Sequence, residues 1–287
     1  MAILLGLAAA LCWGGTDFLG GAAARALGVR WSLFFSQAVG FAGLSLLIAF
    51  LPAIRSQMAS APPEAWLWGL AAALSNFLAM LALMSALARG KAALVAPLTA
   101  TYGVVTTLLS LATGEILDRW ALAGLALCFI GVPCTVYAPD DGRASAGSKA
   151  PLRLALAAAL LFGVGFWLQG HLALPRLGTP ATLWLLYATN LVCLAGLLTA
   201  QPAEFRLPPS SLWLLVTAIG LLSLCGFGAL ALGALTGAVA VVTVLSTLSG
   251  AVTAALGVVL RGERLSPLQW LGIAAALFGV LLLRIGS

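Results

Sequence analysis

Two stretches of this chain repeat each other: TGEILDRWALAGLALCFIGV (residues 113–132) and RGERLSPLQWLGIAAALFGV (residues 261–280). At a constant shift of 148 residues, identical residues coincide in the pairs Gly114/Gly262, Glu115/Glu263, Leu117/Leu265, Gly124/Gly272 and Gly131/Gly279. A second match joins AAALCWGGTDF (8–18) to AAALLFGVGFW (157–167) at a shift of 149. Chance similarity between Ala/Leu-rich segments is the alternative. Because the two matches agree on nearly one shift, with glycines in step, two homologous halves are the better interpretation.

The composition of the chain indicates a membrane protein. Of its 287 residues, 62% are hydrophobic and only 8% are charged, and the mean hydropathy is +1.12. A soluble domain carries roughly 25% charged residues, so most of this surface must face an apolar solvent. The net charge is +6, but the basic residues stand singly in short loops. They are typical of topology determinants at a membrane face, and we expect no nucleic-acid partner.

Apolar segments long enough to cross the bilayer are separated by short polar breaks. About 20 residues are needed for one crossing, and ten such segments can be drawn. They are residues 3–22, 32–51, 65–88, 91–112, 119–138, 152–171, 181–200, 211–233, 237–260 and 267–284. Because each half holds an odd number of spans, the second half enters the membrane from the opposite side. We therefore predict an all-α integral membrane fold of ten transmembrane helices in two inverted five-helix repeats. The halves are residues 1–138 and 152–287, joined by a polar linker at 139–151.

Several of these segments carry the pattern of a known family. The features are the Trp13-Gly14 pair, the stretch ALARGKAALVAPLTATYG (86–103) with Pro97, and a Gly-Glu pair after spans four and nine. With them, the chain resembles the drug/metabolite transporter superfamily, in its ten-helix branch with paired EamA-type domains, over nearly its whole length. The resemblance implies a central substrate cavity between the halves. It also implies export or exchange of small metabolites, amino acids among them, with the aromatic amino-acid exporters as one branch. Span nine lacks a proline matching Pro97, which puts a kink there in doubt.

Tryptophan separates two kinds of position. Seven tryptophans lie near span ends, where interfacial belts form: Trp31, Trp66, Trp68, Trp120, Trp184, Trp213 and Trp270. Trp13 and Trp167 instead lie well inside spans one and six, and the repeat matches Trp13 to Phe162 and Phe18 to Trp167. We predict that these residues line an aromatic cavity that stacks on flat substrate groups, with ordinary helix packing as the alternative.

Asp17 is the acid placed clearly inside a span, and His171 is the one histidine of the chain. Intramembrane charges are costly and usually functional. Asp17 shares a helical face with Trp13 and could bind a substrate amino group or relay a proton, although it is near enough to the span end to be solvated. Spans one and six run in opposite directions, so we expect His171 at the other membrane face, as an interfacial residue.

Hydroxyl groups follow one face of each of the two repeat-related spans four and nine. Span four carries Thr99, Tyr102 and Thr106, and span nine carries Ser246, Ser249 and Thr253. They could offer neutral hydrogen bonds to a polar substrate. Alternatively, they bond helix carbonyls in their own or a neighbouring helix. With the polar Asn76 and the adaptable Met80 of span three, the predicted substrate-binding set is Trp13, Asp17, Phe18, Asn76, Met80, Thr99, Tyr102, Trp167, Ser246 and Ser249.

Several chemistries find no pattern in the sequence. There is no phosphate-cradling loop, no nucleophile–base constellation, and no metal-ligand spacing among the five cysteines. We therefore expect no enzyme activity, no cofactor and no metal, and a facilitative or weakly coupled transport mechanism by alternating access. The predicted substrates are small amphipathic metabolites, most of all amino acids including aromatic ones. Two alternatives remain: a permease for sugar phosphates or nucleotide sugars, which needs cations in its cavity, and a non-transporting membrane scaffold.

The expected partners are the small-molecule substrate and the lipid bilayer, in a cell inner (plasma) membrane, with a monomer preferred over a homodimer. Orientation has two opposing indications. Alternate loops hold four and ten of the 14 Lys and Arg residues, which by the positive-inside rule places both termini outside the cytoplasm. The family resemblance implies both termini inside.

Overall fold

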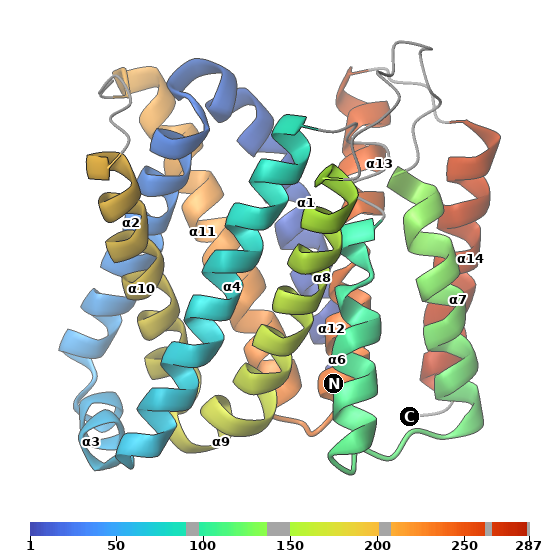
Figure 1. The fold of residues 1–287 in the computed structure, drawn as a ribbon, viewed down its shortest axis with the longest axis horizontal. Coiled ribbons are helices and arrows are strands. Elements are labelled where there is room, and N and C mark those ends of the chain that lie inside the picture. Colours follow the sequence, from blue (N-terminus) through green and yellow to red (C-terminus); the bar gives the residue numbers. More distant parts are fainter. Residues whose placement is uncertain (90–97, 137–149, 201–207, 262–265, 286–287) are drawn as a thin grey trace.

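The structure is a computed structural model that describes residues 1–89, 98–136, 150–200, 208–261 and 266–285. In these ranges every regular element is a helix, and the long helices lie roughly side by side in one bundle (Figure 1). Seven helical stretches are long and apolar enough to cross a membrane: Ala2–Ala24, Val29–Phe50, Pro63–Ala86, Ala150–Leu177, Thr179–Ala200, Leu212–Ala234 and Val239–Leu260. Three shorter apolar helices, Leu98–Ala112, Arg119–Gly131 and Pro267–Leu282, fall at predicted spans four, five and ten. The all-helical membrane character is thus confirmed, with seven full-length candidates among the described residues where ten spans were predicted.

The first half of the chain forms six described helices. They are α1 (Ala2–Leu27), α2 (Val29–Phe50), α3 (Pro52–Ser60), α4 (Pro63–Arg89), α6 (Tyr102–Ala112) and α7 (Arg119–Val136). Gly28, with φ of +78°, makes the turn between α1 and α2, a backbone conformation that favours glycine. The short helix α3 was not predicted. Its proline in the first turn starts a helix in a segment whose polar composition indicated only a connection.

The second half follows the same order with two interruptions. Its elements are α8 (Ala150–Leu168), the π-helix η1 (Gln169–Ala173), α9 (Leu174–Leu177), α10 (Thr179–Ala200), α11 (Ser210–Ala234), α12 (Val239–Ser246), α13 (Ser249–Arg261) and α14 (Pro267–Ile285). The predicted end of span six at 171 is therefore wrong, because the helix continues through η1 to Leu177. Most of the predicted linker lies outside the described residues.

Predicted span nine is broken into α12 and α13 although it contains no proline. The break falls at Thr247 and Leu248, whose N–H groups bond the carbonyls of Val244 and Leu245 three residues back. The side chains of Ser246 and Thr247 also donate to carbonyls three residues back, at 2.7 and 2.6 Å. Such side-chain bonds compete with the regular helical pattern, which explains a break without proline. Pro97, in the equivalent span of the first half, lies outside the described residues.

Helices of the two halves pack directly on one another through glycine. α7 and α14 lie side by side at one edge of the bundle and run in opposite directions (Figure 1). A Cβ added to Gly131 would lie 2.7 Å from the carbonyl oxygen of Gly272, and one added to Gly279 would lie 2.7 Å from that of Gly124. Small residues let two helix backbones approach closely where lipid provides no hydrophobic drive.

A second pair of contacts between the halves joins α6 to α8 and α13 to α1. Thr106 of α6 donates its hydroxyl to the Gly163 carbonyl of α8 at 3.0 Å. Thr253 of α13 donates to the Gly14 carbonyl of α1 at 3.1 Å. Each threonine also bonds a carbonyl in its own helix, at 3.2 and 2.9 Å. Each half thus presents one threonine to a glycine in the first helix of the other half.

Candidate functional site

An aromatic cluster lies between helices of both halves. We call it the aromatic centre, and its members are Trp13, Tyr102, Phe162, Phe166 and Phe227. The Trp13 ring lies 6.0 Å from Phe166 in a stacked arrangement and 4.9 Å from Phe227 in an edge-on one. Tyr102 lies 5.4 Å from Phe166 and 5.9 Å from Phe162. Rings from α1 and α6 of the first half therefore meet rings from α8 and α11 of the second.

Trp13 and Tyr102 are only partly buried within this cluster, whereas Phe166 is 4% exposed. Gly226 of α11 makes the position of Trp13 possible, because a Cβ on that glycine would lie 2.6 Å from the indole ring. An indole held on both sides by other rings keeps one orientation. It can present a flat apolar surface to a substrate at little cost in conformational entropy.

The two predicted hydroxyl faces meet at one point. The Tyr102 hydroxyl and the Ser246 hydroxyl are 3.2 Å apart, which joins α6 to α12 across the halves. The hydroxyls of Thr106 and Thr253 instead bond helix carbonyls, which was the alternative interpretation of these two faces. Thr99 is buried at 6% exposure and Ser249 is partly buried. The faces thus divide into a Tyr102–Ser246 contact beside the aromatic centre and two structural threonines.

Asp17 lies one helical turn beyond Trp13 on α1. Asp17 is exposed. A carboxylate at this place can attract a substrate amino group toward the rings. Phe18 is partly buried next to it, while Asn76 of α4 is buried at 6% exposure and Met80 is partly buried one turn further along the same helix.

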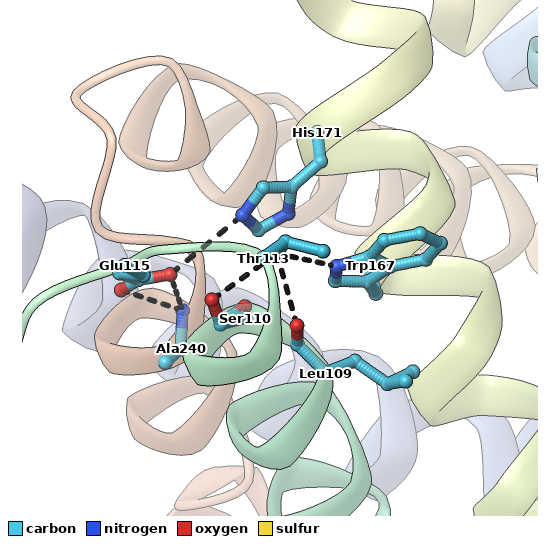
Figure 2. Close-up of polar contacts among 7 residues, drawn as sticks. All are labelled: Leu109, Ser110, Thr113, Glu115, Trp167, His171 and Ala240. Carbon is cyan, nitrogen blue, oxygen red and sulfur yellow. Dashed lines mark hydrogen bonds and ion pairs between the residues drawn. The ribbon is translucent and has the colours of Figure 1, made fainter.

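Trp167 does not join the aromatic centre. Its ring stacks on His171, with ring centroids 5.8 Å apart, and its indole N–H donates to the Thr113 hydroxyl at 3.2 Å (Figure 2). The repeat relates Trp167 to Phe18 in sequence, but a neighbouring histidine in η1 and a threonine after α6 give it polar partners. We predicted that Trp13 and Trp167 line an aromatic cavity, and the structure gives the two rings different neighbours.

A polar cluster surrounds Glu115 at the end of α6. Both carboxylate oxygens accept from the Ala240 N–H of α12 at 3.2 Å, and Oε2 lies 4.0 Å from His171 Nε2 (Figure 2). The Glu115 side chain is only 6% exposed. Burial raises the pKa of this carboxyl, and the hydrogen bond from Ala240 offsets part of that rise. We call Glu115 and His171 the acid–imidazole pair.

This pair was not predicted from the sequence. Glu115 stood out there as part of a repeated Gly-Glu motif, and His171 was interpreted as interfacial because the directions of α1 and α8 keep it from Asp17. The opposite directions of α1 and α8 are visible in Figure 1. The sequence did not predict that the helix continues beyond residue 171 through η1. His171 lies in η1, beside the loop after α6. The repeat counterpart Glu263 lies outside the described residues.

Comparisons with known proteins place this geometry in a class. The EamA-like transporter family matches residues 1–137 and 150–285, so the chain belongs to that family and is a multi-pass membrane transporter of small solutes. A solved structure titled "Crystal structure of protein" shares the fold, with a TM-score of 0.79 at 19% sequence identity, over 98% of this chain and 95% of that one. Comparison with curated protein sequences found no match. Within the described ranges, no group of three or more His, Cys, Asp and Glu residues could hold a metal ion.

Proposed function

We propose that this transporter exports or exchanges small amphipathic metabolites, with amino acids, including aromatic ones, as the leading substrates. The aromatic centre carries this proposal. Its partly buried Trp13 and Tyr102 offer ring faces, the Tyr102 hydroxyl, held by the buried Ser246, offers a neutral hydrogen-bonding group, and Asp17 offers a negative charge to an amino group. A zwitterion with an aromatic side chain matches all three.

The proposed architecture is ten spans in two inverted repeats around a central substrate cavity. Its support is the exchange of equivalent contacts between the halves. Thr106 meets Gly163 as Thr253 meets Gly14, and Gly131 meets Gly272 as Gly279 meets Gly124. Inverted repeats of this kind allow alternating access by rocking one half against the other. We take one chain in the inner (plasma) membrane as the working unit, with a homodimer as the alternative.

The mechanism we propose is facilitative or weakly coupled, and no enzymatic step is part of it. The experiment that tests substrate class is a panel in liposomes: purified protein, radiolabelled solutes, and no imposed proton gradient. We expect uptake of neutral amino acids, fastest for aromatic ones. Tight vesicles that take up no member of a broad metabolite panel contradict the proposal.

Permeases for sugar phosphates are the second transport candidate, and the same panel separates them. Phosphate groups are usually bound by Arg or Lys. The named residues of the aromatic centre and its neighbours Asp17 and Ser246 carry no cation. Uptake of a sugar phosphate or nucleotide sugar with none of the amino acids therefore favours that alternative over ours. No uptake at all, in protein that is folded and inserted, favours a scaffold.

A further inference from the structure

The acid–imidazole pair is a titratable cluster that lies apart from the aromatic centre and joins the two halves. Glu115 belongs to the segment after α6 in the first half. His171 belongs to η1 and Ala240 to α12, both in the second half. η1 and α12 also touch each other, because a Cβ on Gly170 would lie 2.8 Å from the Val239 side chain. The cluster therefore holds three segments together (Figure 2), at the end of the molecule where α6 ends, at the bottom of Figure 1.

The Glu115 side chain is only 6% exposed, yet few titratable groups surround it. α12 carries no titratable side chain, and α6 carries only Tyr102 at its far end. Asp118 accepts from the Ala121 N–H at 2.7 Å, and Arg176 of α9 donates to the Leu172 carbonyl at 3.0 Å. Among the described residues that pack here, His171 is thus the titratable group that faces Glu115.

Such a pair is suited to hold one proton. A neutral Glu115 carboxyl can accept from the Ala240 N–H with one oxygen and direct its O–H toward His171 Nε2, which lies 4.0 Å away. Alternatively, the proton sits on the imidazole and forms an ion pair with the carboxylate. With no proton, a buried negative charge has the backbone N–H groups at the start of α12 and the Ser110 hydroxyl to stabilise it, but no cation, which is costly. With two protons, a cationic imidazole faces a neutral acid.

The segments around the pair are short and interrupted. α12 has eight residues and is separated from α13 by the turn at Thr247, and Gly237, with φ of +85°, precedes it. η1 is a π-helix, a form that often marks functional positions. The fully buried Ser110 hydroxyl lies on the last turn of α6, beside the Glu115 carboxyl. These features permit α12 and η1 to move relative to the end of α6 without unwinding a long helix.

We propose that Glu115 and His171 form a proton-binding site that is occupied when this end of the molecule is closed and emptied when it opens. The proton comes from water, forms an O–H or N–H bond on the pair, and returns to water when α12 and η1 move away from residues 113–118. This inference rests on the proposed transport function, because it makes the opening of one end of the transporter pH-dependent.

The direction of the effect follows from linkage. Burial raises the pKa of Glu115 in the closed conformation, whereas in an open one water restores an ordinary carboxyl pKa of about 4.3. The conformation that binds the proton more tightly is favoured as pH falls. Acidic pH therefore favours the closed end, and the open end becomes more populated as the pH rises through the raised pKa.

Spin-label distances measure this directly in the full-length protein. The five native cysteines are replaced by serine, and labels are placed at Ile116→Cys, next to Glu115, and at Thr236→Cys, shortly before α12, both of which are exposed positions. In nanodiscs we expect one short distance at acidic pH and a growing longer population as pH rises. Glu115→Gln should stay short at every pH, because its amide oxygen can accept from Ala240 and its NH2 group can donate toward His171. Glu115→Ala should be enriched in the long distance at every pH.

Glu64→Gln serves as the matched control, since Glu64 is exposed in the first turn of α4. The spin-label distance in this variant should depend on pH as it does in the parent. His171→Gln should lower the pH midpoint, because the imidazole no longer shares the proton. The proposal is overturned if Glu115→Gln keeps the parental pH response, if acid opens this end, or if the parent shows no pH response. Substrate flux in liposomes is scored separately. If solutes are transported but the spin-label distances do not change with pH, only the proton site is excluded. If the distances change with pH but no solute is transported, only the proposed function is excluded.

Discussion

Trp13 is held in place by both halves, although it belongs to the first. Phe166 and Phe227, which contact it, come from α8 and α11, and Gly226 supplies the space for its indole. A substitution at this position therefore changes a surface shared by the two halves rather than a lipid-facing one. This is the residue at which the proposed substrate contact is most directly tested.

We expect Trp13→Ala to lower aromatic amino-acid uptake in liposomes about tenfold, because aromatic contacts contribute about 0.5–1.5 kcal/mol beyond the buried area. Trp13→Phe should retain most of the flux. Trp68, which is 41% exposed on α4, provides the control, and Trp68→Ala should transport like the parent. Trp167→Ala tests the sequence-based prediction for that residue. Equal flux in the parent, Trp13→Ala and Trp167→Ala, at matched protein levels, would exclude an aromatic substrate contact at both positions.

The two structural threonines make a paired test of the repeat. Thr106→Val and Thr253→Val each remove one hydroxyl bond to a glycine carbonyl of the other half and keep the side-chain shape. Measured bonds of this kind in membranes average about 0.6 kcal/mol, so each variant should lose a similar small amount of stability in thermal unfolding. Thr199→Val is the control, because Thr199 bonds only a carbonyl in its own exposed helical end. A large loss in one variant and none in the other would contradict equivalent roles.

At the scale of elements, the α7–α14 contact depends on the absence of side chains. Gly131→Ala would place a methyl group 2.7 Å from the Gly272 carbonyl oxygen, and rigid backbone cannot yield as a side chain can. We expect a loss of about 1–3 kcal/mol, the usual cost of overpacking, seen as a lower unfolding temperature in detergent. Gly196→Ala on α10 is the matched control, since nothing lies within 4 Å of its added Cβ. That variant should be neutral or slightly stabilised, because alanine favours helix over glycine. If both variants unfold at the parental temperature, the close contact of α7 and α14 is not present in the membrane protein.

Helix breaks are the other finding at this scale. His171 lies in η1 and Ala240 lies at the start of the short helix α12, so both partners of Glu115 belong to the interrupted helices. The polar cluster thus lies where regular helix is interrupted in the second half.

At the scale of the whole molecule, we expect transport without an applied proton gradient but with a rate that depends on pH. Collapse of the gradient with an ionophore should leave amino-acid exchange intact, because no chain of Asp, Glu and His residues crosses the described spans. The rate should change with pH in the parent and not in Glu115→Gln, if opening at the acid–imidazole pair limits turnover. Counterflow in liposomes at several symmetric pH values measures this. Flux that stops on gradient collapse would instead indicate tight proton coupling.

Much of the fold could be predicted from composition and repetition, for a physical reason. Lipid accepts few charged groups and requires the backbone to bond internally, so apolar segments must be helices, and their ends fall where polar residues cluster. The repeat of residues 113–132 at 261–280 similarly indicated that equivalent helices exist in both halves. The glycines of that repeat lie where α7 and α14 touch, although the sequence pattern could not tell which helix each would face.

The sequence by itself determined the membrane class, the helical content, the homologous halves and the transporter family. The tertiary structure decided which residues meet. Trp13 and Tyr102 contact rings that lie 60 or more residues away in the chain. Trp167 contacts Thr113 and His171, and Glu115 is buried against α12. Periodicity specifies the face of a helix on which a residue lies. Helix breaks and cross-half packing specify its neighbours, and those depend on contacts between segments far apart in the chain.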